Sequence, residues 1–155
     1  MNTIARYDVC WYGPFDDCEN EDLKDPNLVL YMLCGTHGLY GKNVPLYIGR
    51  THRSVQTRVR EHTWIESEPD PVLIYAAAIS PEFTAWDDIK NILSYAPPDD
   101  IVINEVESLL IYAHQPVYNS RSKGGLQAMA RQIHVFNTGR RSTLYPELST
   151  QYWYR

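Results

Sequence analysis

The chain has 155 residues, of which 44% are hydrophobic, and its formal net charge is -5. A single domain with one hydrophobic core is expected for residues 1–155. The sequence contains no apolar run long enough to span a membrane, and its first residues lack the apolar centre of a secretion signal. We therefore expect a cytoplasmic protein with no membrane partner.

The cysteines fit this expectation. Cys10, Cys18 and Cys34 are an odd number without close pairs, which is typical of reduced thiols. A zinc site that adds His37 to these cysteines is an alternative, but the spacing matches no common zinc-binding motif.

The predicted elements begin with residues 1–27, where aromatic residues are followed by an acidic run. We expect this segment to be a packed extension that covers an edge of the sheet. Two apolar, β-prone runs, Leu28 to Leu33 and Leu46 to Ile48, predict antiparallel strands. The glycines between them predict a long connecting loop. Ser54 is then placed to cap a helix that begins the next segment.

In the second half, the apolar run Val72 to Ile79 predicts a buried strand that completes a three-stranded antiparallel sheet. Helices are expected at about Glu82 to Ser94 and after Asp100. A short helical piece near Leu126 to Ala130 and a strand from Gln132 to Phe136 follow. The predicted fold class is α/β, of the α+β kind, in which helices flank the sheet and each end carries an extension.

The charges are segregated along the chain. From Arg50 to His62 there are four basic residues and one acidic residue, and from Ser108 to Arg155 there are six and one. This segregation predicts a basic face that follows phosphates, with acidic surfaces elsewhere. The alternative is that each cluster is only solvated surface.

Two positions on the predicted helices point to chemistry. Arg58 and His62 lie one helical turn apart, which directs a cation and a titratable imidazole to the same side. Glu107 lies beside the apolar stripe of the later helix, next to Ile103 and Ile111 on its own face. A carboxylate in that position must reach solvent, pair with a cation or hold a metal ion.

The tripeptide Tyr47-Ile48-Gly49 is followed by Arg50 and Thr51. It matches the second signature of the GIY-YIG endonucleases, which the stretch from Leu28 to Asn119 resembles. The arginine of the family helix, followed four residues later by histidine or tyrosine, corresponds to Arg58 and His62. Glu107 is similar to the metal-binding glutamate of the family, and Asn119 to the asparagine that ends its core. The resemblance implies that the nuclease core covers about residues 28–119, with the C-terminal extension at 120–155.

The first signature departs from the family pattern. We align it with Val29-Leu30-Tyr31, in which valine replaces glycine. The rival Gly38-Leu39-Tyr40 lies too close to Tyr47 to leave chain for two paired strands and a turn, so Tyr31 is favoured. The turn between Thr51 and Ser54 is also longer than usual in the family.

The resemblance implies a metal-dependent endonuclease that hydrolyses phosphodiester bonds of DNA with one Mg²⁺ or Mn²⁺, held by Glu107. Tyr31 or Tyr47 would act as the base if nearby cations lower its pKa from about 10. Arg58 would bind phosphate, His62 would orient water or relay a proton, and Asn119 would orient the site groups. Substrate contacts are expected from the basic residues Arg50, Arg53, Arg60, Arg121, Lys123, Arg140 and Arg141.

Several alternatives stay open. The substrate is expected to be double-stranded DNA, with single-stranded DNA or RNA as alternatives, and restriction, repair, mobile-element or anti-phage roles all fit. A protein of a different class, a catalytically silent GIY-YIG-like module that binds DNA or protein, would also explain the replaced glycine. No second DNA-reading domain is recognisable, so specificity is expected to depend on the insertions, the tail, a homo-oligomer or a regulatory partner.

Overall fold

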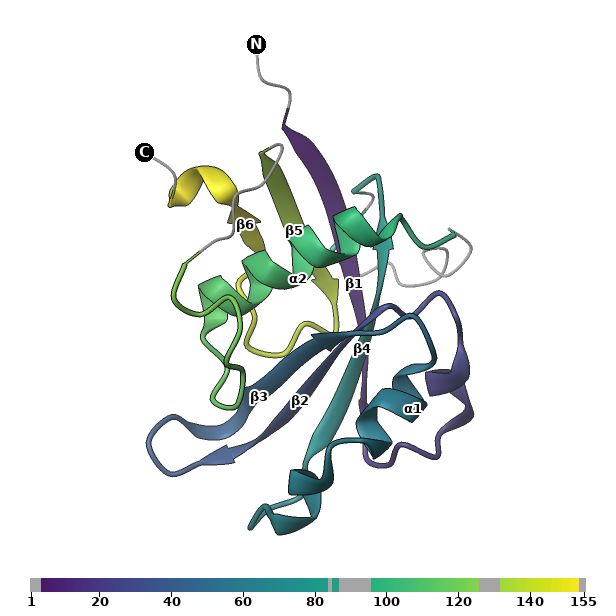
Figure 1. Ribbon diagram of the computed structural model, residues 1–155, viewed down its shortest axis with the longest axis vertical. Coiled ribbons are helices and arrows are strands. Elements are labelled where there is room, and N and C mark those ends of the chain that lie inside the picture. Colours follow the sequence, from purple (N-terminus) through teal and green to yellow (C-terminus); the bar gives the residue numbers. More distant parts are fainter. Residues whose placement is uncertain (1–3, 84, 87–95, 126–131, 154–155) are drawn as a thin grey trace.

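The computed structural model describes residues 4–83, 85–86, 96–125 and 132–153, and these form a mixed α/β structure around one curled sheet (Figure 1). The strands are β1 (Ala5–Phe15), β2 (Leu30–His37), β3 (Gly41–Arg50), β4 (Leu73–Ser80), β5 (Ile133–Gly139) and β6 (Glu147–Ser149). The helices are α1 (Val55–Arg60), α2 (Asp100–His114) and the 3₁₀ turns η1 (Glu21–Lys24), η2 (Thr63–Ser67) and η4 (Thr150–Tyr152).

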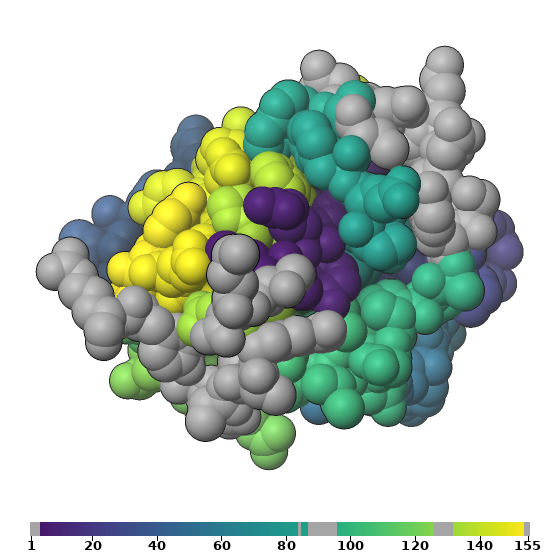
Figure 2. Space-filling view, turned by 90° about the horizontal axis from the view of Figure 1, so that it is seen from above, coloured from purple at the N-terminus to yellow at the C-terminus, as the bar shows by residue number. Residues whose placement is uncertain are grey.

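The prediction of a three-stranded sheet is wrong, because the sheet has six strands in the order β3-β2-β4-β1-β5-β6. The predicted antiparallel unit is present as β3-β2-β4 and forms one half. The other half is built by the two extensions: β1 pairs antiparallel with β4 and parallel with β5, and β6 pairs antiparallel with β5. In Figure 2 the purple N-terminal residues accordingly lie between the yellow C-terminal residues and the teal chain around the end of β4.

The N-terminal segment therefore does not cover an edge of the sheet, as predicted, but lies in its middle. Tyr7, Val9 and Trp11 alternate along β1 and are buried on the face that α2 covers. On the opposite face Asp8 is buried as well, and its carboxylate accepts a hydrogen bond from the Thr138 hydroxyl on β5. A strand paired on both sides can hold such a polar residue because its partners supply the hydrogen bonds.

The connection between β2 and β3 is also shorter than predicted. Only residues 38–40 form the turn, and both strands run well into the glycine-rich segment. Gly35 belongs to β2, where a Cβ atom would lie 2.7 Å from Cδ1 of Leu46. The glycine thus serves close packing within the hairpin, and the register shifts after Leu33 and Gly35 absorb the irregular backbone.

The two main helices lie on opposite faces of the sheet (Figure 1). As predicted, Ser54 caps α1, because its side chain accepts a hydrogen bond of 3.1 Å from the Thr57 N–H. Asp99 caps α2 in the same way through the Val102 N–H. The apolar side of α2, which includes Val106 and Leu109, is buried against the sheet as its spacing predicted.

Three further predictions concern the second half of the chain. The strand expected from Gln132 to Phe136 is confirmed as β5. The helix expected at about Glu82 to Ser94 lies mostly outside the described residues, and Glu82 and Phe83 are not helical. The helical piece near Leu126 to Ala130 also lies outside them. None of the helices that the structure describes is long and apolar enough to cross a membrane.

Candidate active site

A cleft of about 660 Å³ runs along the outer edge of β3 and is closed by α2 and by the segment that follows it. The predicted site residues that line it are Tyr47, Arg50, Arg53, Arg58, Glu107, Asn119 and Arg121. The charged groups are therefore four arginines and one glutamate, in a protein whose net charge is -5. This excess of fixed positive charge in a concave site favours an anionic ligand.

Glu107 is the carboxylate of this cleft, and its side chain is 17% exposed. Burial raises the pKa of Glu107, while the nearby charges of Arg50, Arg58 and Arg121 act in the opposite direction. The closest cation is Arg50, whose Nε lies 3.7 Å from Oε1 of Glu107. This ion pair is longer than a good hydrogen bond, and the Arg50 backbone N–H donates to the carboxylate as well. A carboxylate accepts up to about four hydrogen bonds, so its oxygens keep capacity for another ligand.

Arg58 reaches the cleft from α1, where its neighbour Glu61 holds it. Nη1 of Arg58 donates a hydrogen bond of 2.6 Å to Oε2 of Glu61, and Arg53 donates to the other oxygen of the same carboxylate. Both arginines line the cleft while they are bound to the Glu61 carboxylate. Glu61 therefore restricts two guanidinium groups that would otherwise lose more conformational entropy on binding an anion.

Beside the cleft, Tyr31 and His62 form a partly buried polar contact. The Tyr31 hydroxyl lies 2.7 Å from Nε2 of His62, and the indole N–H of Trp64 donates to Nδ1 of His62 at 3.3 Å. Because an indole nitrogen only donates, Nδ1 must be the acceptor and Nε2 must carry the proton in a neutral imidazole. Burial, and next the charge of Arg58, lower the pKa of His62, in agreement with a neutral ring.

Tyr31 links this histidine to Tyr47, which lines the cleft. Tyr31 is fully buried, and burial is the main cause that raises its pKa, followed by Tyr47. The Tyr31 hydroxyl therefore stays protonated, accepts from His62 and can donate to Tyr47. The ring centroids of Tyr47 and His62 are 4.5 Å apart, so the three side chains form one compact group. Trp64 donates to His62, His62 donates to Tyr31, and Tyr31 can donate to the oxygen of Tyr47.

The arrangement also explains the glycine of Tyr47-Ile48-Gly49. Gly49 pairs with Tyr31 across the β2-β3 ladder, and a Cβ atom at Gly49 would lie 2.6 Å from Cζ of Tyr31. Only glycine leaves room for the ring at this position. Tyr40, the rival candidate for the first signature, lies in the hairpin turn, is 65% exposed and stacks on His37. The structure thus brings Tyr31, and not Tyr40, to Tyr47 and His62.

The side chain of Asn119 forms hydrogen bonds with both backbone groups of one β3 residue, Ile48. Its Oδ1 accepts from the Ile48 N–H and its Nδ2 donates to the Ile48 carbonyl, each at 2.9 Å. The side chain is buried, and its amide is engaged at both ends. This is the geometry of a positioning residue that fixes a loop against a strand.

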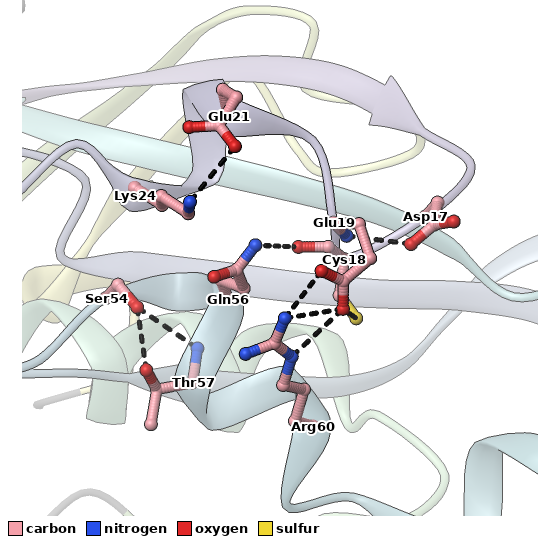
Figure 3. A network of polar contacts seen from close by, with 9 residues as sticks. All are labelled: Asp17, Cys18, Glu19, Glu21, Lys24, Ser54, Gln56, Thr57 and Arg60. Carbon is pink, nitrogen blue, oxygen red and sulfur yellow. Dashed lines mark hydrogen bonds and ion pairs between the residues drawn. The ribbon is translucent and has the colours of Figure 1, made fainter.

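Four of the predicted substrate-binding residues do not line the cleft: Arg60, Lys123, Arg140 and Arg141. Figure 3 shows the case of Arg60, whose guanidinium makes hydrogen bonds with both carboxylate oxygens of Glu19. Beside this pair, the Gln56 amide donates to the Cys18 carbonyl at 2.8 Å. The acidic N-terminal segment thus holds the side of α1 that faces away from Arg58.

Two aromatic residues at the cleft were not predicted as site residues. Tyr118, directly before Asn119, lines the cleft, and Trp64, two residues after His62, packs against Tyr118 with ring centroids 4.7 Å apart. Asn104 and Ser108, which flank Glu107 on α2, line the cleft as well. Asn104, Glu107 and Ser108 are spaced so that they share one side of a helix, and this spacing could have predicted them as site residues. For Tyr118 and Trp64 the sequence offers no signal except that they are close to Asn119 and His62.

Among the described residues, one group of three potential metal ligands lies close together, namely Asp17, Cys18 and Glu19. Glu19 is already paired with Arg60. The three cysteines and His37 are not brought together in this group. No protein-family model, curated protein or solved structure matches the chain.

Proposed function

We propose that this protein is a metal-dependent endonuclease of the GIY-YIG type that hydrolyses phosphodiester bonds of DNA. The observation that carries the proposal is that Glu107, Arg58 and Tyr47 line one cleft, with Tyr31 and His62 grouped around Tyr47. These residues come from α2, α1, β3, β2 and the turn after α1. Phosphodiester hydrolysis needs an activated water, cations on the phosphate and help for the leaving oxygen. The cleft contains candidates for each of these needs.

The residues present fit a hard divalent cation. Glu107 offers carboxylate oxygens, and the side chains of Asn104 and Ser108 add neutral oxygen atoms in the same cleft. One protein carboxylate with a shell of water and substrate oxygens is a usual environment for Mg²⁺. When bound, Mg²⁺ or Mn²⁺ would polarise the phosphate and stabilise the leaving oxygen. A cation beside Glu107 would also oppose the rise in pKa that burial causes.

In this proposal Tyr47 is the base. The attacking water oxygen forms the new bond to phosphorus, the bond to the leaving oxygen breaks, and the proton of the water passes to the Tyr47 oxygen. Tyr47 acts in its phenolate form, having first released its own proton to solvent. The Tyr31 hydroxyl, which can donate to Tyr47, and the nearby Arg58 charge would stabilise this phenolate. Arg50, Arg53, Arg58 and Arg121 hold the phosphate and its neighbours in the cleft.

The test is cleavage of supercoiled plasmid, single-stranded DNA and structured RNA with Mg²⁺ or Mn²⁺. Glu107→Gln keeps the shape of the side chain and removes its charge, so we expect metal-dependent nicking by the wild type to fall by about a hundredfold or more. Asp100→Asn is the matched control, since Asp100 lies on the same helix with an exposed side chain that faces His52. Equal cleavage by the wild type and Glu107→Gln would refute the role of Glu107 in metal binding.

A second candidate function is a catalytically silent module that binds nucleic acid. It is favoured by the contacts between Arg50 and Glu107, since the guanidinium charge and the backbone N–H of Arg50 both stabilise the carboxylate without a metal ion. In that case Mg²⁺ and Mn²⁺ would change neither the thermal stability nor the state of any substrate, and binding of nucleic acid would persist in EDTA. The plasmid assay and a metal titration of thermal unfolding therefore separate the two candidates.

A further inference from the structure

An exposed aromatic ring stands at the rim of the arginine-rich cleft. Tyr118 lines the cleft and keeps 44% of its surface exposed. Trp64 packs against the Tyr118 ring in a T-shaped arrangement, with an interplanar angle of 65°. His62 packs against Trp64 in turn, with ring centroids 6.0 Å apart. A large aromatic side chain that packs on one side and is open on the other has a face available to a ligand.

The Tyr118 ring is fixed in this position. Its hydroxyl donates to Oε1 of Glu68, and its backbone N–H donates to the Leu46 carbonyl at 2.8 Å. The next residue, Asn119, is bound to Ile48 through both ends of its amide. The ring therefore needs little reordering to receive a flat partner, which lowers the entropic cost of binding.

The chemistry of the ligand follows from the two features together. The arginines of the cleft favour phosphate groups, and a fixed aromatic face next to them favours a flat, π-electron-rich group. Fixed cations that follow a backbone beside an aromatic platform are the pattern of sites for unpaired nucleotides. In a B-form duplex both faces of each base are already stacked on neighbouring bases, so no base face is free for Tyr118 without unstacking.

We propose that the cleft binds an unpaired nucleotide, with its base stacked on Tyr118 and its phosphate held by the arginines. The proposal deepens the proposed function, on which it rests for the nature of the ligand, by naming the substrate class. Single strands, flaps and duplexes with an extruded base present such a nucleotide, whereas an intact duplex does not. The expected preference for double-stranded DNA is thereby replaced by a preference for unpaired DNA.

The test measures binding by fluorescence anisotropy in EDTA, where no metal-dependent cleavage occurs. The probes are a labelled single-stranded oligonucleotide, its blunt duplex, and a strand of equal length in which abasic sites replace the bases. We expect the wild type to bind the single strand most tightly. Tyr118→Ala should weaken that binding by about fivefold to 150-fold and leave the affinity for the abasic strand unchanged.

Two variants serve as controls. Tyr118→Phe retains the ring and loses only the hydrogen bond to Glu68, so its affinity should stay within about threefold of the wild type. Tyr40→Ala removes another exposed tyrosine, 65% exposed in the hairpin turn and outside the cleft, and should have no effect. The comparison of base-containing and abasic strands on the wild type decides the question even if Tyr118→Ala does not fold.

The outcomes distinguish this proposal from the one on which it rests. Metal-dependent cleavage that Glu107→Gln abolishes, together with equal affinity for base-containing and abasic strands, would overturn the stacking site and leave the nuclease intact. Tighter binding of the duplex than of the single strand would do the same. Absence of binding and cleavage for every nucleic acid would overturn both.

Discussion

Replacement of Gly49 by alanine should destabilise the fold and disturb the candidate site at the same time. The added Cβ atom would lie 2.6 Å from both Cζ and Oη of Tyr31 and 2.8 Å from Cε1. Carbon atoms in contact normally lie about 3.5–4.0 Å apart, so the ring would have to move by about 1 Å. Tyr31 is fully buried on a strand that pairs with β3 on one side and β4 on the other, so the backbone cannot yield easily.

The cost can be worked out from these contacts. Overpacking of a buried site costs about 1–3 kcal/mol, and loss of the hydrogen bond between Tyr31 and His62 adds about 0.5–1.5 kcal/mol. We therefore expect the free energy of unfolding of Gly49→Ala to fall by about 2–4 kcal/mol. Urea denaturation followed by circular dichroism measures it, and plasmid nicking by the same variant reports on the site.

Gly38→Ala is the matched control, because a Cβ atom at Gly38 has no neighbour within 4 Å. Its effect should stay within about 0.5 kcal/mol of zero. The decisive comparison repeats Gly49→Ala in a Tyr31→Leu background, where Cζ and the hydroxyl are absent and most of the cost should disappear. An undiminished cost in that background, or a Gly49→Ala protein as stable as the wild type, would refute the steric explanation.

The remaining predictions concern protonation, charge and the first signature. Burial lowers the pKa of His62, so the unfolded state binds the proton of this histidine more tightly than the folded state. The free energy of unfolding should therefore fall as the pH drops below about 6.5. Urea denaturation at several pH values should show a shallower fall for His62→Gln. Arg58→Ala should weaken DNA binding and reduce its dependence on salt, as measured by anisotropy. Arg60→Ala should match the wild type, because Arg60 pairs with Glu19 and does not line the cleft. Tyr31→Phe removes the hydroxyl that accepts from His62 and can donate to Tyr47, so cleavage should slow by about tenfold, whereas Tyr40→Phe should leave the rate unchanged.

Those parts of the fold that depend on local pattern could be predicted from the sequence. The strands β2, β4 and β5 follow from apolar runs, and the cap at Ser54 follows from a side chain that binds a nearby N–H group. The place of β1 could not be predicted, because it depends on pairing with β5, more than a hundred residues later in the chain. The alternation of Tyr7, Val9 and Trp11 could have predicted a strand with one buried face, but the acidic and aromatic residues around it concealed this pattern.

For the candidate site, sequence spacing predicted more than charge did. Arg58 lines the cleft from α1, but Arg60, two residues later, lies towards Glu19, because side chains two positions apart point to nearly opposite sides of a helix. Counting basic residues could not separate the two, whereas helical periodicity could. Tyr118 was missed for a different reason: an aromatic residue that packs in the core and one that is exposed at a rim look alike in a sequence.

The contacts of Asn119 connect the sheet edge to the candidate site. β3 is an edge strand of the described sheet, and an edge strand leaves backbone groups open to pairing with another chain. Asn119 occupies both outward groups of Ile48, and the Tyr118 N–H occupies the Leu46 carbonyl between the same two segments. The loop that protects the edge is thus the loop that presents Tyr118 to the cleft. The same three hydrogen bonds hold Tyr47, on the protected strand, and Tyr118, on the protecting loop, at a fixed separation. The proposed base and the proposed stacking platform therefore belong to one rigid unit.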